Sequence, residues 1–254
     1  MLSKNICGYR QTLSGKDQTM KITDPVKSFV KNNSDCAAIF QELNIDFCCG
    51  GDVPLQDACE EMGLEADDVF QRIMGLKAFP SNEKDVSGLT PGELVAHIES
   101  THHVYLKEAL PRLAVLMEKV CQAHSPRHPE LRPLQTLFQN IREDLEPHLL
   151  KEEQVLFPLI VKLERDALGL KMRVAAGPIR VMRHEHDEVG KLLKQMRKLA
   201  NGYVAPEDGC QSFELLYEEL RKLEEDTHLH IHKENNILFP AVDQKIEVSP
   251  ASKA

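Results

Sequence analysis

The sequence contains one eleven-residue segment twice. Residues 148–158 read HLLKEEQVLFP and residues 230–240 read HIHKENNILFP, so six of the eleven positions are identical. The copies are 230 − 148 = 82 residues apart, and each stands late in a long stretch of helical periodicity. A tandem repeat of this kind restricts the fold to architectures that a duplicated helical hairpin can build.

A histidine precedes each copy at a matching distance, on the helix before it. His103 precedes His148 by 45 residues, and His186 precedes His230 by 44 residues. Four long helical segments are predicted, at about residues 90–124, 130–165, 178–201 and 208–245. Short connections between long helices favour an antiparallel four-helix bundle. Few segments alternate with strand periodicity, so the predicted fold class is all-α.

A small helical module is expected before the bundle, because residues 20–78 contain several short amphipathic patterns. The stretch FPSNEKDVSGLTPGE that follows is rich in Pro, Ser, Gly and charge, which is typical of a linker. Thr90 and Glu93 match a capping box at the start of the first long helix. The predicted parts are a flexible extension at 1–19, a small helical domain at 20–78, a linker at 79–89, the bundle at 90–247 and a flexible tail at 248–254.

The repeated His-x-x-x-Glu spacing places two polar side chains on one helix face, one turn apart. His148 and Glu152 therefore project together, as do His230 and Glu234. When the two hairpins pack about a pseudo-two-fold axis, both pairs meet in the core with the two upstream histidines. Four imidazoles and two carboxylates in an apolar core are costly without a partner.

A dinuclear metal site satisfies these groups together, with two imidazoles on each metal and the carboxylates as bridges. Mixed nitrogen and oxygen ligands with open positions suit iron, and also manganese or zinc. A single such pair is usually a solvated surface pair, so the matched duplication is what favours the metal site. The predicted ligands are His103, His148, Glu152, His186, His230 and Glu234.

Neighbouring histidines compete for these places: His102, His184, His228 and His232. The spacing to Glu234 favours His230, and the repeat step favours His186, whereas His102 and His232 leave the ligand set slightly open. The remaining histidines are expected at the surface or as helix caps: His97, His124 and His128.

Asp144 and Asp226 each precede a predicted ligand histidine by four residues. A carboxylate one turn away can accept the second N–H of a ligating imidazole and fix its tautomer, so both are expected as outer partners. Glu153 adjoins Glu152 but points about 100° around the helix, so we expect it to be solvated. Both copies of Leu-Phe-Pro are expected to serve packing rather than chemistry.

The formal net charge of −9 disfavours general attraction to nucleic acid or to an anionic membrane surface. No apolar run approaches the roughly 20 residues that cross a bilayer. The first twenty residues are polar and lack the apolar segment of a secretory signal. We therefore expect a cytoplasmic protein without nucleic-acid or membrane partners.

At these residues the chain resembles the di-iron iron–sulfur cluster repair proteins, the repair of iron centres family. The C-terminal half is similar to a haemerythrin-like bundle, with His103, HLLKE at 148–152, EHDE at 185–188 and HIHKE at 230–234 in the family's places. The N-terminal module is similar to the family's small cysteine-bearing domain, whose hallmark is DFCCGG, here residues 46–51.

The resemblance implies two non-haem iron ions bridged by Glu152 and Glu234, oxo-bridged when oxidised, with the four predicted histidines as terminal ligands. It also implies a bacterial stress protein that restores iron–sulfur clusters damaged by nitric oxide or oxidants. Its implied partners are damaged iron–sulfur proteins, with nitric oxide or oxygen as small ligands. Iron donation and nitric oxide reduction are both implied activities, so whether the protein is an enzyme stays open. A carrier or sensor of oxygen or nitric oxide is the alternative, and a homodimer is one option for the assembly.

Four interpretations of Cys48 and Cys49 compete: a redox pair, metal ligands, a strained disulfide, or small side chains at a helix end capped by Gly50 and Gly51. A disulfide between neighbours closes a strained ring, and a reducing compartment opposes it. A cysteine-only metal site needs four thiolates, which the remaining cysteines do not pattern. Beside a redox-active di-iron centre, adjacent thiols can supply electrons or take up iron or a nitrosyl. We therefore expect a redox or transfer role.

Overall fold

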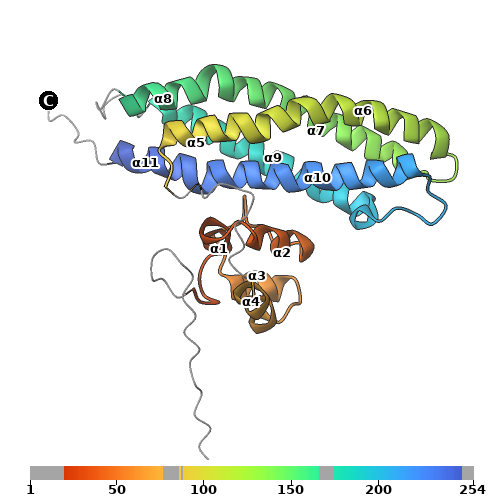
Figure 1. Ribbon diagram of the computed structural model, residues 1–254, viewed down its shortest axis with the longest axis horizontal. Helices are drawn as coiled ribbons and strands as arrows, with labels where there is room; N and C mark the ends of the chain where they lie inside the picture. The colour runs from red at the N-terminus through yellow and green to blue at the C-terminus, as the bar shows by residue number, and fades with distance from the viewer. Residues whose placement is uncertain (1–19, 77–85, 87, 166–173, 248–254) are drawn as a thin grey trace, which may run out of the picture. The chain divides into compact units, whose positions relative to one another are not determined.

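The computed structural model describes residues 20–76, 86, 88–165 and 174–247 (Figure 1). Within these ranges the chain is helical, and an isolated bridge between Pro25 and Pro54 is the single β-type pairing. The all-α prediction is confirmed. The predictions for residues 1–19 and 248–254, and for most of the linker at 79–89, fall outside the described residues.

The described residues divide into two compact units. One contains residues 20–46 and 50–76, and the other contains the residues from 86 onward together with Phe47–Cys49. The two cysteines of DFCCGG therefore belong to the unit of the long helices, although the residues on both sides of them belong to the smaller unit.

The smaller unit consists of four short helices: α1 Val26–Asn32, α2 Cys36–Glu42, α3 Leu55–Glu61 and α4 Ala66–Met74. Its core is aromatic, with the rings of Phe29 and Phe40 packed edge to face at 6.2 Å. Cys36 and Cys59 are buried in the same unit, and burial raises the pKa of Cys36 to about 12. A thiol with so high a pKa stays protonated and is a poor metal ligand or nucleophile.

The larger unit consists of four long helical rods (Figure 1). The first two rods contain α5 Pro91–Ile98, η1 Glu99–His103 and α6 Val104–His124, then α7 Leu131–Lys151, η2 Glu152–Leu156 and α8 Phe157–Arg165. The last two rods contain α9 Ala176–Leu199, then α10 Gln211–Lys233, η5 Glu234–Leu238 and α11 Phe239–Glu247, with a short turn, η4 Asn201–Tyr203, after α9. Helix α6 packs against α7 and α10, and α9 packs against the same two helices. The predicted antiparallel four-helix bundle is confirmed.

The first rod begins at the capping box that the sequence predicts. The Thr90 hydroxyl accepts a hydrogen bond from the Glu93 N–H at 3.3 Å, and the Glu93 carboxylate accepts one from the Thr90 N–H at 2.9 Å. This reciprocal capping box satisfies two N–H groups that the helix start would otherwise leave without partners.

Three rods depart from α-helical geometry at the predicted ligands. The π-helical turn η1 ends at His103, while η2 begins at Glu152 and η5 begins at Glu234. Such turns insert one extra residue into a helix and are frequent at functional sites. The sequence patterns do not predict these π-helical turns. Helix α6 contains Pro111 and continues through it as one helix.

Two apolar clusters fill the bundle on either side of the predicted ligands. One includes Leu106, Leu145 and Leu223, and the other includes Ile98 and Leu238. Each fully buried large apolar side chain contributes roughly 1.5–3 kcal/mol to folding. The free energy gained by burying these two clusters offsets the cost of burying the polar ligand side chains between them.

Candidate metal centre

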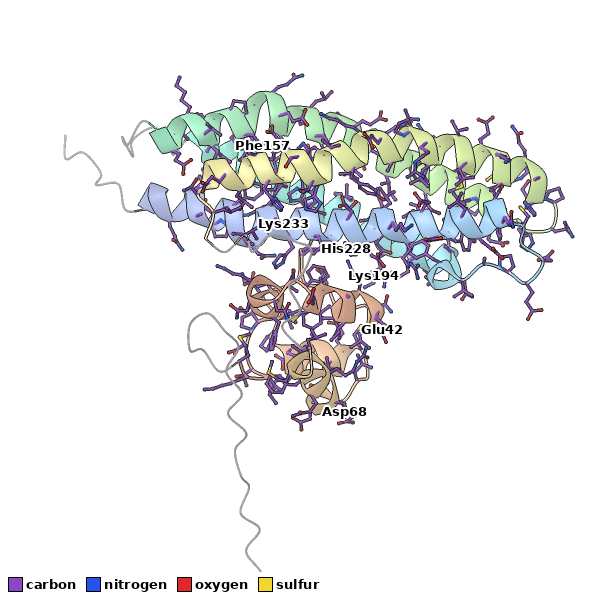
Figure 2. All side chains as sticks on the ribbon, viewed as in Figure 1. Glu42, Asp68, Phe157, Lys194, His228 and Lys233 are labelled. Atoms are coloured by element: carbon purple, nitrogen blue, oxygen red, sulfur yellow. The ribbon has the colours of Figure 1, made fainter. Side chains whose placement is uncertain are left out.

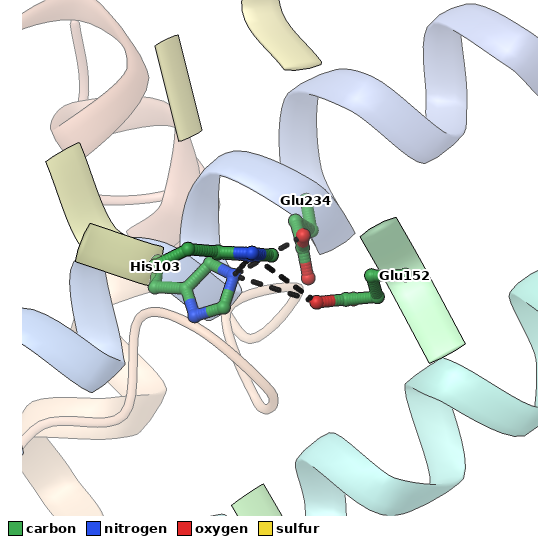
Figure 3. Close-up of side chains that lie close together, drawn as sticks. His103, Glu152 and Glu234 are labelled. Atoms are coloured by element: carbon green, nitrogen blue, oxygen red, sulfur yellow. Dashed lines mark hydrogen bonds and ion pairs between the residues drawn. The ribbon is translucent and has the colours of Figure 1, made fainter. Parts of the chain in front are cut away.

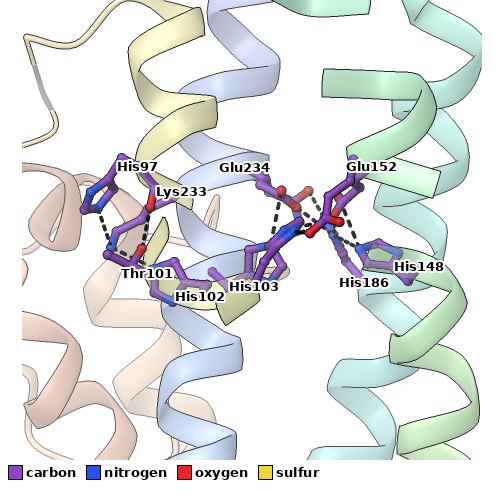
Figure 4. A network of polar contacts seen from close by, with 12 residues as sticks. His97, Thr101, His102, His103, His148, Glu152, His186, Lys233 and Glu234 are labelled. Atoms are coloured by element: carbon purple, nitrogen blue, oxygen red, sulfur yellow. Dashed lines mark hydrogen bonds and ion pairs between the residues drawn. The ribbon is translucent and has the colours of Figure 1, made fainter. Parts of the chain in front are cut away.

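The bundle brings all six predicted ligands to one level of its core, and each is at most 2% exposed. Figure 4 shows the histidine and glutamate side chains converging from different rods. They form two groups whose ligand atoms lie within 4.8 Å of one another: His103, Glu152, His230 and Glu234, and His148, Glu152, His186 and Glu234. Both glutamates belong to both groups, as bridging carboxylates would.

The two oxygens of each glutamate face different groups. For Glu152, Oε2 lies 3.4 Å from His103 Nε2, and Oε1 lies 3.2 Å from His148 Nε2. For Glu234, Oε1 lies 3.2 Å from His230 Nε2, and Oε2 lies 3.0 Å from His186 Nε2. Figure 3 shows His103 facing both carboxylates.

The donor set fits a pair of cations. Both oxygens of Glu152 and Oε2 of Glu234 are buried and make no hydrogen bond of good geometry among the described residues. The Nε2 atoms of His148 and His186 lie 3.2 Å apart, and those of His103 and His230 lie 3.3 Å apart. Buried carboxylate oxygens without donors and paired imidazole nitrogens are groups that metal ions would satisfy.

The electrostatics of the site agree with this chemistry. Burial, followed by the neighbouring Glu234 carboxylate, raises the pKa of Glu152 to about 8. For Glu234, burial alone would raise the pKa, but His230 and His186 hold it well below its usual range. Burial lowers the pKa of His230 to about 4, so this imidazole stays neutral and able to bind a metal.

Three ligand histidines donate or accept through their outward Nδ1 atoms. His103 Nδ1 lies 2.8 Å from Glu153, His148 Nδ1 lies 2.8 Å from Glu185, and His186 Nδ1 lies 2.9 Å from the amide oxygen of Asn235. With Nε2 on a metal, each Nδ1–H would donate to these acceptors. Outer hydrogen bonds of this kind orient ligands and increase their basicity.

The predicted outer partners were wrong in both cases. Asp144 is exposed on α7 and keeps its hydration, while Glu185 from α9 occupies the expected place beside the buried His148 ring. Asp226 pairs with His102 Nδ1 at 2.8 Å instead of with His230. The prediction that Glu153 is solvated was also wrong, because η2 begins at Glu152 and does not keep the α-helical side-chain directions.

The competing histidines lie outside both groups. His102 packs flat on the His230 ring, with centroids 5.5 Å apart, and His232 Nδ1 lies 3.2 Å from the Phe47 carbonyl oxygen. His184 is exposed and His228 is half-buried. His124, expected at the surface or as a helix cap, is the last residue of α6 and is buried against Phe213, with Nε2 at 3.1 Å from the Cys210 sulfur.

The repeated Leu-Phe-Pro segments pack on the site, as expected. The Phe157 ring stacks on His103 at 5.4 Å, and the Phe239 ring stacks on His186 at 6.1 Å. Figure 2 labels Phe157, which is the first residue of α8. Each phenylalanine therefore covers the first-helix histidine of its own hairpin, which fixes the ring and excludes water.

The cysteine segment contacts the helices that carry the ligands. Asn236, two residues after Glu234, donates to the Cys48 carbonyl at 3.2 Å, and the Cys49 sulfur lies 3.7 Å from the His186 carbonyl oxygen. The two cysteines are not joined in a disulfide, and their sulfurs lie 3.7 Å apart. The Cys49 thiol therefore lies against the backbone of a predicted ligand.

Glu185 and Asn235 are the site residues that the sequence patterns missed. Asn235 occupies the same place in the repeat as Glu153, and both accept from the first-helix histidine of their hairpin. A position-by-position comparison of the two copies pairs Glu153 with Asn235, but it does not show that either side chain faces a histidine.

Two family profiles cover most of the described chain. The hemerythrin HHE cation binding domain matches residues 93–242, and a domain of unknown function, DUF542, named ScdA_N, matches residues 22–77. An iron-sulfur cluster repair protein YtfE of Dickeya chrysanthemi is 37% identical over 203 residues, which cover 80% of this chain and 89% of the relative. The chain belongs to the iron–sulfur cluster repair protein family.

Other relatives of this family carry similar names. An iron-sulfur cluster repair protein ScdA of Staphylococcus haemolyticus is 32% identical over 80% of this chain and 90% of its own length. A probable iron-sulfur cluster repair protein of Haemophilus influenzae is 37% identical, with coverage of 80% and 89%. Among the described residues of this family member, no helix combines the length and apolar character needed to cross a bilayer.

Proposed function

We propose that the bundle binds two iron ions and that the protein uses this centre to repair iron–sulfur clusters damaged by nitrosative or oxidative stress. The observation that carries the proposal is the pair of overlapping ligand groups that share Glu152 and Glu234. The names of the relatives support the repair role. The proposed clients are proteins with damaged clusters, and the proposed small ligands are nitric oxide and oxygen.

In this proposal His103 and His230 hold one iron, His148 and His186 hold the other, and both glutamates bridge. Iron bound by two imidazoles and shared carboxylates supplies open coordination positions and a metal that can be passed on. A ligand imidazole must be neutral to bind, which the lowered pKa of His230 favours. Glu152 must give up its proton when a cation enters, because the raised pKa keeps it protonated in the metal-free site.

The surroundings of the ligands support reversible binding. The rings of Phe157 and Phe239 cover two of the histidines, so their orientation is kept when metal leaves. Glu153 and Glu185 are partly exposed and each contacts a lysine amine, Lys107 at 2.6 Å and Lys151 at 2.5 Å. These pairs keep the outer carboxylates ionised, as the lowered pKa of each indicates.

A redox or transfer role for Cys48 and Cys49 belongs to the same proposal. Their contacts to Asn236 and to the His186 carbonyl support it, because thiols at this position can receive iron or a nitrosyl, or supply electrons. The proposed location is the cytoplasm, where free thiols stay reduced. Full repair activity in a Cys48→Ser, Cys49→Ser double variant would exclude this role.

Repair of a nitric-oxide-damaged [4Fe–4S] hydratase by the anaerobically reconstituted protein tests the proposal. The intact protein should restore hydratase activity, and Glu152→Leu should lose both bound iron and repair. Glu143→Leu, an exposed change on the same helix, is the control and should behave as the intact protein does. Reversible oxygen binding without any repair would favour a carrier or sensor instead, and steady turnover of nitric oxide would favour a reductase.

A further inference from the structure

The two halves of the centre differ in their outer hydrogen bonds. On the assumption that the proposed function holds, we propose that the metal held by His103 and His230 is the one released to a damaged cluster, while the metal held by His148 and His186 is retained. We call these the releasing half-site and the retaining half-site.

In the retaining half-site both outward nitrogens have acceptors. His148 Nδ1 meets Glu185 Oε2 at 2.8 Å, and the other Glu185 oxygen contacts Lys151 Nζ at 2.5 Å. His186 Nδ1 meets the Asn235 amide oxygen at 2.9 Å. A metal here is bound by two imidazoles whose Nδ1–H groups both donate.

In the releasing half-site only one of the two outward Nδ1 atoms has such an acceptor. His103 Nδ1 meets Glu153 Oε1 at 2.8 Å. His230 is 1% exposed, and its Nδ1 atom has no hydrogen-bond partner among the described residues. When Nε2 of this ring binds a metal, the proton stays on Nδ1, where it is buried without an acceptor.

The repeat shows which side chain makes the difference. Since His186 corresponds to His103, Glu185 corresponds to His102, and Lys151 corresponds to Lys233. The lysine contact is kept in both copies, because Lys233 Nζ lies 2.9 Å from His102 Nε2 (Figure 4). The carboxylate of Glu185 is replaced by the imidazole of His102. This imidazole lies flat on the His230 ring, 12° from parallel, and does not accept the Nδ1–H of His230.

Loss of an outer partner typically costs 10–100-fold in metal affinity. The releasing half-site therefore binds its metal more weakly by about that factor, although both half-sites share the same two glutamates. Departure of one metal leaves the bridging carboxylates anchored on the other, so the bundle stays assembled and ready to be refilled.

The test is metal release from the full-length protein loaded anaerobically with ferrous iron and mixed with excess ferrozine, a chromogenic ferrous chelator. Release should occur in two phases of equal amplitude, with rates about 10–100-fold apart. Glu185→Ala removes the acceptor of His148 Nδ1 in the retaining half-site and should speed only the slow phase. His102→Glu restores the missing carboxylate and should slow only the fast phase. Glu188→Ala, an exposed change on the same helix as Glu185, is the matched control and should alter neither phase.

Anomalous diffraction from partly stripped crystals identifies the half-site that keeps its metal. Iron remaining between His148 and His186 supports the proposal, whereas iron remaining between His103 and His230 overturns it. A single release phase for both irons, or an effect of Glu185→Ala on the fast phase alone, also overturns it. If His102→Glu fails to fold, as judged by circular dichroism, the Glu185→Ala result decides.

These outcomes are independent of repair. Two-phase release from a protein that repairs no cluster would reject the proposed function and keep the difference between half-sites. Uniform release from a protein that does repair clusters would reject only the difference.

Discussion

Gly190 on α9 faces the sulfur of Cys49. A Cβ built at this position lies 3.6 Å from the Cys49 sulfur, which is an ordinary van der Waals contact. Gly190→Ala should therefore leave Cys49 in place. Because glycine inside a helix costs about 0.5–1 kcal/mol relative to alanine, this variant should be more stable by that amount.

A longer side chain gives the opposite result. Leucine at position 190 carries atoms about one bond length beyond Cβ, so they would overlap the sulfur, and either the Cys49 segment or α9 must shift. Gly190→Leu should displace Cys49 from the His186 carbonyl and expose its half-buried thiol.

Urea unfolding and the alkylation rate of Cys49, measured by mass spectrometry, check both variants. Gly177→Leu is the matched control, since it lies on the same helix and a Cβ there meets no atom within 4 Å. The control should leave the alkylation rate unchanged, and Gly190→Leu should raise it several-fold. A destabilised Gly190→Ala protein, or an unchanged rate in Gly190→Leu, would refute the reasoning.

Three further predictions concern the metal site. Between pH 6.5 and 8 the metal-free protein should lose stability as pH rises. Glu152, with a pKa of about 8, and His103 both bind more protons in the folded protein than in the unfolded chain. Burial alone would lower the pKa of His103, but the neighbouring Glu152 and Glu153 raise it. Urea titrations should show this loss and Glu152→Gln should reduce it; a profile that rises with pH would contradict the assignment. Chelation of the loaded protein should lower its Tm, because metal binds the folded state alone; an unchanged Tm would contradict tight binding. Phe239→Ala should cost about 3–5 kcal/mol in urea unfolding and weaken metal retention, and normal retention would contradict the stacking role on His186.

The repeat made the bundle and the six ligand positions predictable. A period that recurs within one chain ties two helices to the same chemistry, and the i, i+4 spacing fixes which side chains share a face. The repeat step favoured His186 over His184, whereas the sequence left the choice between His102 and His103 open. The structure brings His103 and His186 to the centre.

The outer partners could not be predicted in this way. Glu185 reaches His148 from another rod, so no local spacing connects the two residues. Glu153 turns toward His103 because a π-helical turn begins at Glu152, and such a turn has no residue signature in the sequence. Asp144 and Asp226 have the right spacing, but exposure of the first and the contact of the second with His102 decide their roles.

Anomalous diffraction at the iron edge from the anaerobically reconstituted protein tests the central claim most directly. We predict two iron peaks inside the bundle, one between His103 and His230 and one between His148 and His186, with Glu152 and Glu234 each contacting both. A single peak, or iron bound away from these two glutamates, would contradict the account.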